Sequence, residues 1–250
     1  MNVRARQNVR EDRLNFEKVE AGRLFGIPVV LDFTFILLVI LFGFDYFTSG
    51  SIDRMSYGLV LVTGVAVSIL LHEFGHAAAA RYYGVPTTHI ELNGFGGLCY
   101  FARAIPPGRW PNIVVLLAGP AVTLLLWQLC SGLTYVMADL PDSAGPIGGL
   151  DKLTGLISHL GYINYWLLLF NLLPSHPLDG GRALAQVLSR WLGYDRSMRV
   201  VAYMGLMVAL WVALLGLRSS GYTLLIAFSL FQSNMMVLAA HGGPRWRRWN

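Results

Sequence analysis

The sequence predicts an all-α polytopic membrane protein with about six transmembrane helices and a small β-hairpin or re-entrant sheet after the second helix. Two observations support this fold class. The 250 residues are 55% hydrophobic and only 13% charged, with a mean hydropathy of +0.53, whereas soluble domains carry about 25% charged residues. The apolar residues also gather in blocks of about 20, the length that a helix needs to cross a bilayer.

Six apolar blocks account for the expected spans, with a short amphipathic helix at residues 182–191 between the fourth and the fifth. The spans are expected at about residues 33–47, 57–83, 110–137, 156–173, 198–217 and 222–240. Residues 24–31, ahead of the first span, read as a strand at the membrane surface. Residues 85–109 are rich in glycine and β-prone side chains and too polar to span, which favours the hairpin or re-entrant sheet.

The charge distribution predicts the orientation. We expect residues 1–23 to form a cytoplasmic N-terminal tail, residues 24–240 the membrane domain, and residues 241–250 a basic cytoplasmic C-terminal tail. In this arrangement all but three of the 19 Lys and Arg residues lie on the side of the termini. Because positive charge concentrates on the cytoplasmic side, both termini are expected in the cytoplasm, and the expected location is the cell (inner) membrane. The basic C-terminal segment with its tryptophans fits a membrane surface and predicts no nucleic-acid partner.

The second expected span carries His72, Glu73 and His76 in an otherwise apolar stretch. An ionised residue at the bilayer centre costs about 2.5–3.5 kcal/mol on insertion scales, so such residues persist where something compensates them. Positions i and i+4 share one face of a helix, so both imidazoles can reach one metal ion. Glu73 stands beside the first histidine, where a base acting on water at the metal would be needed.

A catalytic zinc usually takes three protein ligands, so this pattern leaves one ligand missing. Residues 171–182, at the end of the fourth span, contain two prolines and two glycines. Broken backbone at membrane depth is tolerated where it lines a cavity or is buried in protein. Asp179 is the preferred third ligand, because it is ionisable and its backbone can turn inward. His176 is the rival, and it could instead contact a ligand or the substrate.

With these two motifs the sequence resembles the site-2 protease family of intramembrane metalloproteases. The resemblance is carried by H-E-F-G-H at residues 72–76 and N-L-L-P-S-H-P-L-D-G-G at residues 171–181, and G-I-P-V at 26–29 and A-G-P at 118–120 agree. It implies one zinc ion per chain, held by His72, His76 and Asp179. It also implies Glu73 as catalytic acid and base, and Asn171 in substrate binding. The chain is similar to a compact member without PDZ or CBS domains.

The leading hypothesis is a zinc-dependent intramembrane endopeptidase that cleaves a transmembrane or membrane-proximal segment of a membrane protein, in regulated proteolysis. The expected partners are that substrate and the lipid bilayer. An exposed strand edge within residues 85–109 is expected to pair with the unwound substrate. The alternative is a metal-ion or proton transporter, since intramembrane His, Glu and Asp also suit ion pathways. A third possibility is a catalytically silent relative that binds a membrane partner, against which the intact Glu73 argues.

Overall fold

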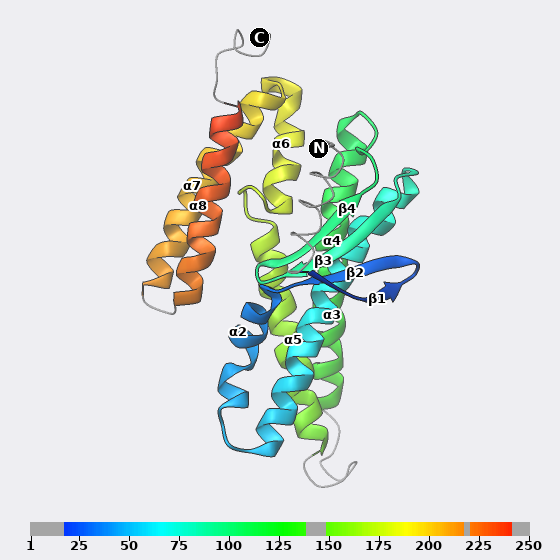
Figure 1. The fold of residues 1–250 in the computed structure, drawn as a ribbon, viewed down its shortest axis with the longest axis vertical. Coiled ribbons are helices and arrows are strands. Elements are labelled where there is room, and N and C mark those ends of the chain that lie inside the picture. The colour runs from blue at the N-terminus through cyan, green and yellow to red at the C-terminus, as the bar shows by residue number, and fades with distance from the viewer. Residues whose placement is uncertain (1–17, 139–148, 218–220, 242–250) are drawn as a thin grey trace, which may run out of the picture. The chain divides into compact units, whose positions relative to one another are not determined.

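The computed structural model describes residues 18–138, 149–217 and 221–241, and these form two compact units. The first unit ends at Ala104 and the second begins at Ile105, and we describe each by itself. The first unit contains four strands and two helices (Figure 1): β1 (Lys18–Leu24), β2 (Ile27–Asp32), α2 (Phe35–Phe47), α3 (Ile52–Tyr82), β3 (Thr87–Asn93) and β4 (Gly96–Phe101). The second contains five helices: α4 (Arg109–Ala138), α5 (Gly149–Asn171), α6 (Asp179–Leu192), α7 (Tyr194–Gly216) and α8 (Gly221–His241).

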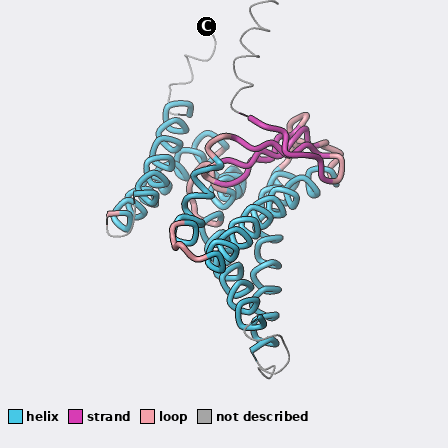
Figure 2. Tube along the Cα trace, turned by 60° about the horizontal axis from the view of Figure 1, so that its bottom comes forward, coloured by secondary structure: helices cyan, strands magenta, loops and turns pink. Residues whose placement is uncertain are grey.

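The four strands form one sheet in the order β1-β2-β3-β4, drawn in magenta in Figure 2. The β1–β2 and β3–β4 pairs are antiparallel hairpins, whereas β2 and β3 run parallel. Parallel neighbours need a long crossover connection, and helices α2 and α3 supply it. The helix that carries the histidines, α3, is therefore part of the connection between the two central strands of the sheet.

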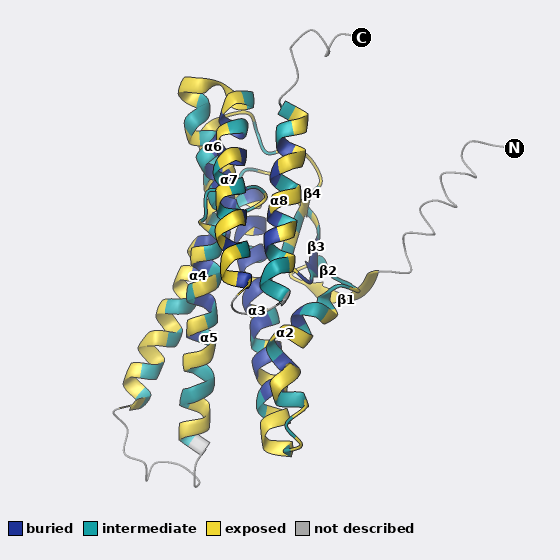
Figure 3. Cartoon of the chain, turned by 90° about the vertical axis from the view of Figure 1, so that its left-hand side faces the viewer, coloured by how far each residue is buried: buried dark blue, intermediate teal, exposed yellow. Residues whose placement is uncertain are grey.

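Helix α3 is the central element of the first unit. Its 31 residues rise about 46 Å, well beyond the ~30 Å of a bilayer core. It packs against α2, β3 and β4, and its buried residues give the dark blue stretch in Figure 3. That stretch includes polar side chains: the Ser68 hydroxyl donates to the Gly64 carbonyl (2.9 Å). Buried polar groups on α3 are thus found together with hydrogen-bond partners.

The second unit is a helical bundle in which α4 packs against α5 and α6, α6 against α7, and α7 against α8. Small residues line the contacts between its helices, which lets backbones approach closely, as is usual between membrane helices. One buried cluster comprises Ala185, Met198, Val201, Ala202 and Val237. A second comprises Ala209, Val212, Ala227 and Leu230. The α7–α8 pair therefore contributes to both clusters.

Five of the described helices, α3, α4, α5, α7 and α8, are long and apolar enough to cross a membrane. The predicted helical, multi-pass membrane fold with a small sheet is confirmed. The first expected span, at residues 33–47, is the short apolar helix α2. Its 13 residues reach about 20 Å, which is less than the ~30 Å core. The sheet is larger than expected, because residues 24–31 join the hairpin of residues 85–109 in one layer.

The division into two tails and a membrane domain stays a prediction, since residues 1–17 and 242–250 lie outside the described residues. Lys18, which the sequence analysis assigns to the N-terminal tail, begins β1. Its Nζ contacts Oε2 of the buried Glu91 at 2.6 Å. The hydrogen bond to Glu91 raises the pKa of Lys18 above its usual value. This ion pair ties the start of β1 to β3.

Candidate metal centre

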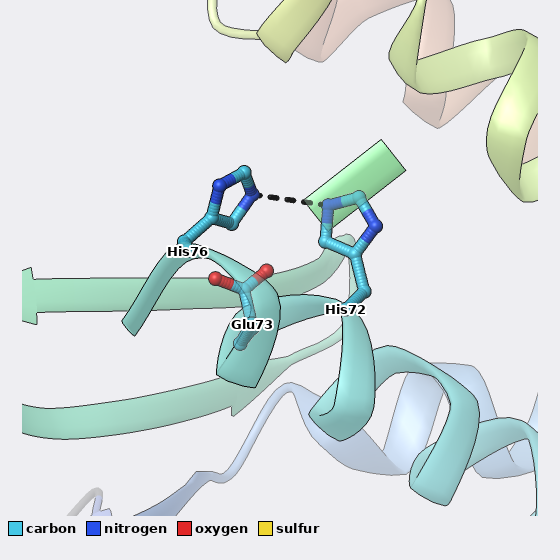
Figure 4. Close-up of side chains that lie close together, drawn as sticks. All are labelled: His72, Glu73 and His76. Carbon is cyan, nitrogen blue, oxygen red and sulfur yellow. Dashed lines mark hydrogen bonds between the residues drawn. The ribbon is translucent and has the colours of Figure 1, made fainter. Parts of the chain in front are cut away.

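His72, Glu73 and His76 lie on one turn of α3 and are all buried, with exposed fractions of 4%, 5% and 7%. Their potential ligand atoms lie within 4.8 Å of one another. Figure 4 shows the two imidazoles turned toward each other, with the Glu73 carboxylate beside them. Among the residues that the structure describes, they form the one group of this kind.

The two imidazoles fit a zinc ion in both distance and chemistry. Their Nε2 atoms are 3.2 Å apart, and a tetrahedral zinc with Zn–N bonds of about 2.0–2.1 Å holds two nitrogens about 3.3–3.4 Å apart. At this separation the two nitrogens either share one proton or share one metal ion. Imidazole is among the preferred ligands of zinc. The predicted pairing of His72 with His76 on one helix face is therefore present.

Strand β4 lies directly against Glu73 through Gly97. A Cβ atom added at Gly97 would lie 2.5 Å from Cγ of Glu73 and 2.7 Å from its Oε1. Glycine is therefore the residue that lets the backbone of β4 approach the carboxylate this closely. From the sequence, the glycines of residues 85–109 indicated only a hairpin or re-entrant sheet, and the contact of Gly97 with Glu73 was not predicted. The contact depends on the fold of α3 against β4, so no local pattern could have revealed it.

Cys99, two residues further along β4, is part of the same surroundings. Its burial raises the pKa of the thiol to about 12, the Glu73 carboxylate adds to this rise, and a hydrogen bond with Thr87 opposes it. Cys99 and Cys130 are both free cysteines.

The other predicted site residues lie in the second unit, around the break between α5 and α6. Asn171 is the last residue of α5, and its Nδ2 donates to the Leu167 carbonyl at 3.0 Å. Asp179 is the first residue of α6 and is buried. Added Cβ atoms at Gly180 and Gly181 would overlap the backbone of Leu172 and Ser175, respectively. These glycines allow residues 172–178 to fold back onto the first turn of α6.

His176, the rival to Asp179, is held by α8. Its Nδ1 lies 2.9 Å from Oγ of Ser233, and its backbone N–H donates to Oδ1 of Asn234 at 3.1 Å. Burial lowers the pKa of His176 to about 4, and the positive charges of Arg182 and His241 lower it further. Ser233 and Asn234 were not predicted as site residues. An amide in an otherwise apolar span was the available signal.

These features define a membrane protein with a buried His-Glu-x-x-His metal centre, and the comparisons give its family. The model of peptidase family M50 matches residues 60–139 and 144–214. The chain is 32% identical over 210 residues to zinc metalloprotease MJ0392 of Methanocaldococcus jannaschii, covering 84% of this chain and 56% of that protein. It is 34% identical over 176 residues to the putative zinc metalloprotease sll0528 of Synechocystis, covering 68% and 44%.

The fold has a counterpart among solved structures. The site-2 protease from Methanocaldococcus jannaschii superposes with a TM-score of 0.63 at 29% identity, covering 88% of this chain and 94% of that chain. The chain therefore belongs to peptidase family M50. It spans about half the length of the curated relatives that it matches. The resemblance to site-2 proteases inferred from the motifs is confirmed.

We expect Cys99 to be alkylated slowly at neutral pH. A pKa of about 12 leaves on the order of a thousandfold less thiolate than an ordinary cysteine has, and the thiolate is the reacting form. The measurement is the rate of iodoacetamide modification, by mass spectrometry, in a Cys130→Ser variant between pH 7 and 10. The rate should rise about tenfold per pH unit throughout. A plateau near pH 9 would show that the thiol is shielded without a raised pKa.

Proposed function

We propose that this chain is a zinc-dependent endopeptidase that cleaves a transmembrane or membrane-proximal segment of a membrane-protein substrate, in regulated proteolysis. The observation that carries the proposal is the buried group of His72, Glu73 and His76 on α3, in a chain of peptidase family M50. The printed names of its relatives, zinc metalloprotease and site-2 protease, support this reaction class.

We propose His72, His76 and Asp179 as the ligands of one zinc ion. The separation of the two imidazoles supports the first two. For Asp179 the support is chemical: it is a buried carboxylate at the start of α6, and a catalytic zinc needs a third protein ligand. When bound, zinc supplies a Lewis acid that polarises the scissile carbonyl and makes water a nucleophile near neutral pH.

Glu73 is then the acid and base of the reaction. Its carboxylate accepts the proton of the attacking water and later donates it to the nitrogen of the leaving amine. Burial suits this task, because a carboxyl group without bulk water around it passes its proton to the substrate and not to solvent. Asn171 would orient the substrate carbonyl. One N–H of its amide already bonds to Leu167, and the group carries a second N–H donor.

Strand β4 is the proposed docking edge for the substrate backbone. In the described sheet β4 pairs only with β3, so its other edge can accept a further strand. The strand packs on α3 and passes Glu73 at Gly97. A substrate added at this edge would have to leave its helical conformation, and main-chain hydrogen bonds to β4 would replace those lost from the helix.

The proposed orientation places both termini in the cytoplasm, in the cell (inner) membrane, with the tails and membrane domain divided at residues 23 and 240. The support is the excess of Lys and Arg on the cytoplasmic side of this arrangement. Only Arg54, Lys152 and Arg218 lie on the other side. His72 stands about two-thirds of the way from Ile52 to Tyr82 along α3. With this orientation the histidines lie nearer the cytoplasmic end of the helix, from which water would reach them.

The Glu73→Gln variant tests the proposed reaction. It removes the proton acceptor and keeps the shape of the side chain, so zinc content should stay at the wild-type level while cleavage falls by at least about 100-fold. Zinc is measured by mass spectrometry of the purified protein, and cleavage on a pool of synthetic transmembrane peptides in liposomes. A comparison of membrane proteomes would then show which protein accumulates uncut. Unchanged cleavage would refute the role of Glu73, and metal transport without any proteolysis would favour the transporter.

Gly97→Ala should separate catalysis from folding. The new Cβ would lie 2.5 Å from Cγ and 2.7 Å from Oε1 of Glu73, so the Glu73 side chain has to rotate away from β4 to make room. Its carboxylate would then leave its place, and we expect cleavage to fall at least tenfold while the melting temperature and zinc content change little. Gly132→Ala on α4, where an added Cβ would meet no atom within 4 Å, is the matched control. Wild-type cleavage in Gly97→Ala would mean that Glu73 does not need its observed position.

Proline substitution along β4 tests the docking edge. Proline lacks the N–H that an added strand would use. Cys99→Pro and Tyr100→Pro are therefore expected to differ in effect, because consecutive residues of a strand point their N–H groups to opposite edges. The one whose N–H faces the open edge should lose cleavage and keep its zinc, and the other should disturb the pairing with β3. Equal turnover in both variants and the wild type would exclude substrate pairing at β4.

A further inference from the structure

Ser233 and Asn234 of α8 hold the loop that precedes Asp179. We infer that these two side chains are positioning residues for Asp179: they fix residues 175–178 so that the carboxylate is presented in one orientation. The inference rests on the proposed function, in which Asp179 is a zinc ligand. All the contacts that support it lie within the second unit.

The amide of Asn234 binds the backbone of His176 at two points. Its Oδ1 accepts from the His176 N–H at 3.1 Å, and its Nδ2 donates to the His176 carbonyl at 2.9 Å. The same Nδ2 lies 2.9 Å from Oγ of Ser175 and 2.7 Å from the carbonyl of Leu230. Asn234 and Ser175 both have an exposed fraction of 0%. A side-chain amide that matches a peptide group in this way fixes both the position and the direction of the chain.

Ser233 adds a contact to the side chain of His176. Its Oγ lies 2.9 Å from Nδ1 of His176. Consecutive residues of α8 therefore bind the backbone and the imidazole of His176. A single hydrogen bond would let the loop rotate about it, whereas these contacts together exclude such rotation.

The neighbouring helices leave room for this arrangement. A Cβ atom at Gly205 of α7 would overlap the Asn234 amide, lying 2.6 Å from Nδ2. A Cβ atom at Gly181 of α6 would overlap Ser175, lying 2.7 Å from its backbone nitrogen. Glycines on two helices thus stand where the amide and the loop need space: Gly181 of α6 beside residue 175, and Gly205 of α7 beside the Asn234 amide.

Two backbone hydrogen bonds connect the segment held by Ser233 and Asn234 to the turn that carries Asp179. The Leu178 N–H donates to the Ser175 carbonyl at 2.9 Å, and the Arg182 N–H donates to the Leu178 carbonyl at 3.1 Å. The turn 175–178 therefore runs directly into the first turn of α6, of which Asp179 is the first residue. Release of His176 would free this turn, and the carboxylate of Asp179 would sample several orientations.

The experiment compares the zinc affinity of Asn234→Ala, Ser233→Ala and wild type by competition with a chromophoric chelator. Loss of a side chain that orients a metal ligand typically weakens metal binding by about 10–100-fold. We expect a loss in that range for Asn234→Ala and a smaller one, on the order of threefold, for Ser233→Ala. Asp179→Ala gives the loss for a missing ligand. Gln232→Ala, which removes an exposed amide of the same helix, should bind zinc as the wild type does.

Hydrogen exchange of residues 172–180 provides the second measurement. Asn234→Ala should exchange faster at His176, whose N–H it frees, with α7 and α8 unchanged. If exchange at His176 is faster but the zinc affinity equals that of the wild type, the inference is overturned, and Asn234 has only a structural role. If Asn234→Ala does not fold, Ser233→Ala decides: zinc affinity equal to that of Gln232→Ala overturns the inference.

The outcomes also separate this inference from the proposed function. If the wild type binds zinc and Glu73→Gln still cleaves, the proposed reaction is refuted, while the zinc affinities still test the role of Asn234. If the wild type binds no zinc, the proposed function and the inference are both refuted. If the wild type binds zinc, cleavage requires Glu73 and Asn234→Ala binds zinc as tightly as the wild type, only the inference about α8 is overturned.

Discussion

The burial of two imidazoles and a carboxylate on an apolar helix is the constraint on which the rest of this structure depends. Ionisable groups at membrane depth are costly unless something compensates them. The 3.2 Å separation of the His72 and His76 ring nitrogens shows how α3 answers this constraint: the two groups face each other and not the surrounding apolar side chains. A metal ion between them would satisfy both at once, so the stability of this stretch of α3 and its chemistry have the same origin.

The membrane also constrains the backbone. Backbone N–H and C=O groups cannot be left without hydrogen-bond partners in a membrane, so non-helical segments must pack closely against other polar groups of the protein. Glycine makes such packing possible at Gly97 beside Glu73, at Gly181 beside Ser175 and at Gly205 beside Asn234. In each case the absent side chain gives its space to a polar group. Glycine thus serves where the fold brings backbone or amide groups together, and not only at turns.

Composition and helical spacing were enough to predict the spans, the sheet after the second of them and the pair formed by His72 and His76. These features depend on block length and on the i, i+4 repeat, both of which are local. The joining of residues 24–31 to β3 was not predicted, because it depends on strands paired across more than fifty residues. Gly97 and Asn234 were missed for the same reason: their partners, Glu73 and His176, are distant in sequence, and only the packing of helices and strands brings them into contact.

The ligand candidates also differ in how firmly their own elements hold them. His72 and His76 share one helical turn, so the geometry of α3 fixes their separation without further support. Asp179 follows a loop that contains two prolines and is followed by two glycines, and a loop has no comparable internal constraint. A metal ligand at such a position needs its conformation set from outside. The contacts of α8 with His176 supply that constraint, which gives a buried asparagine in an apolar helix a physical reason to be there.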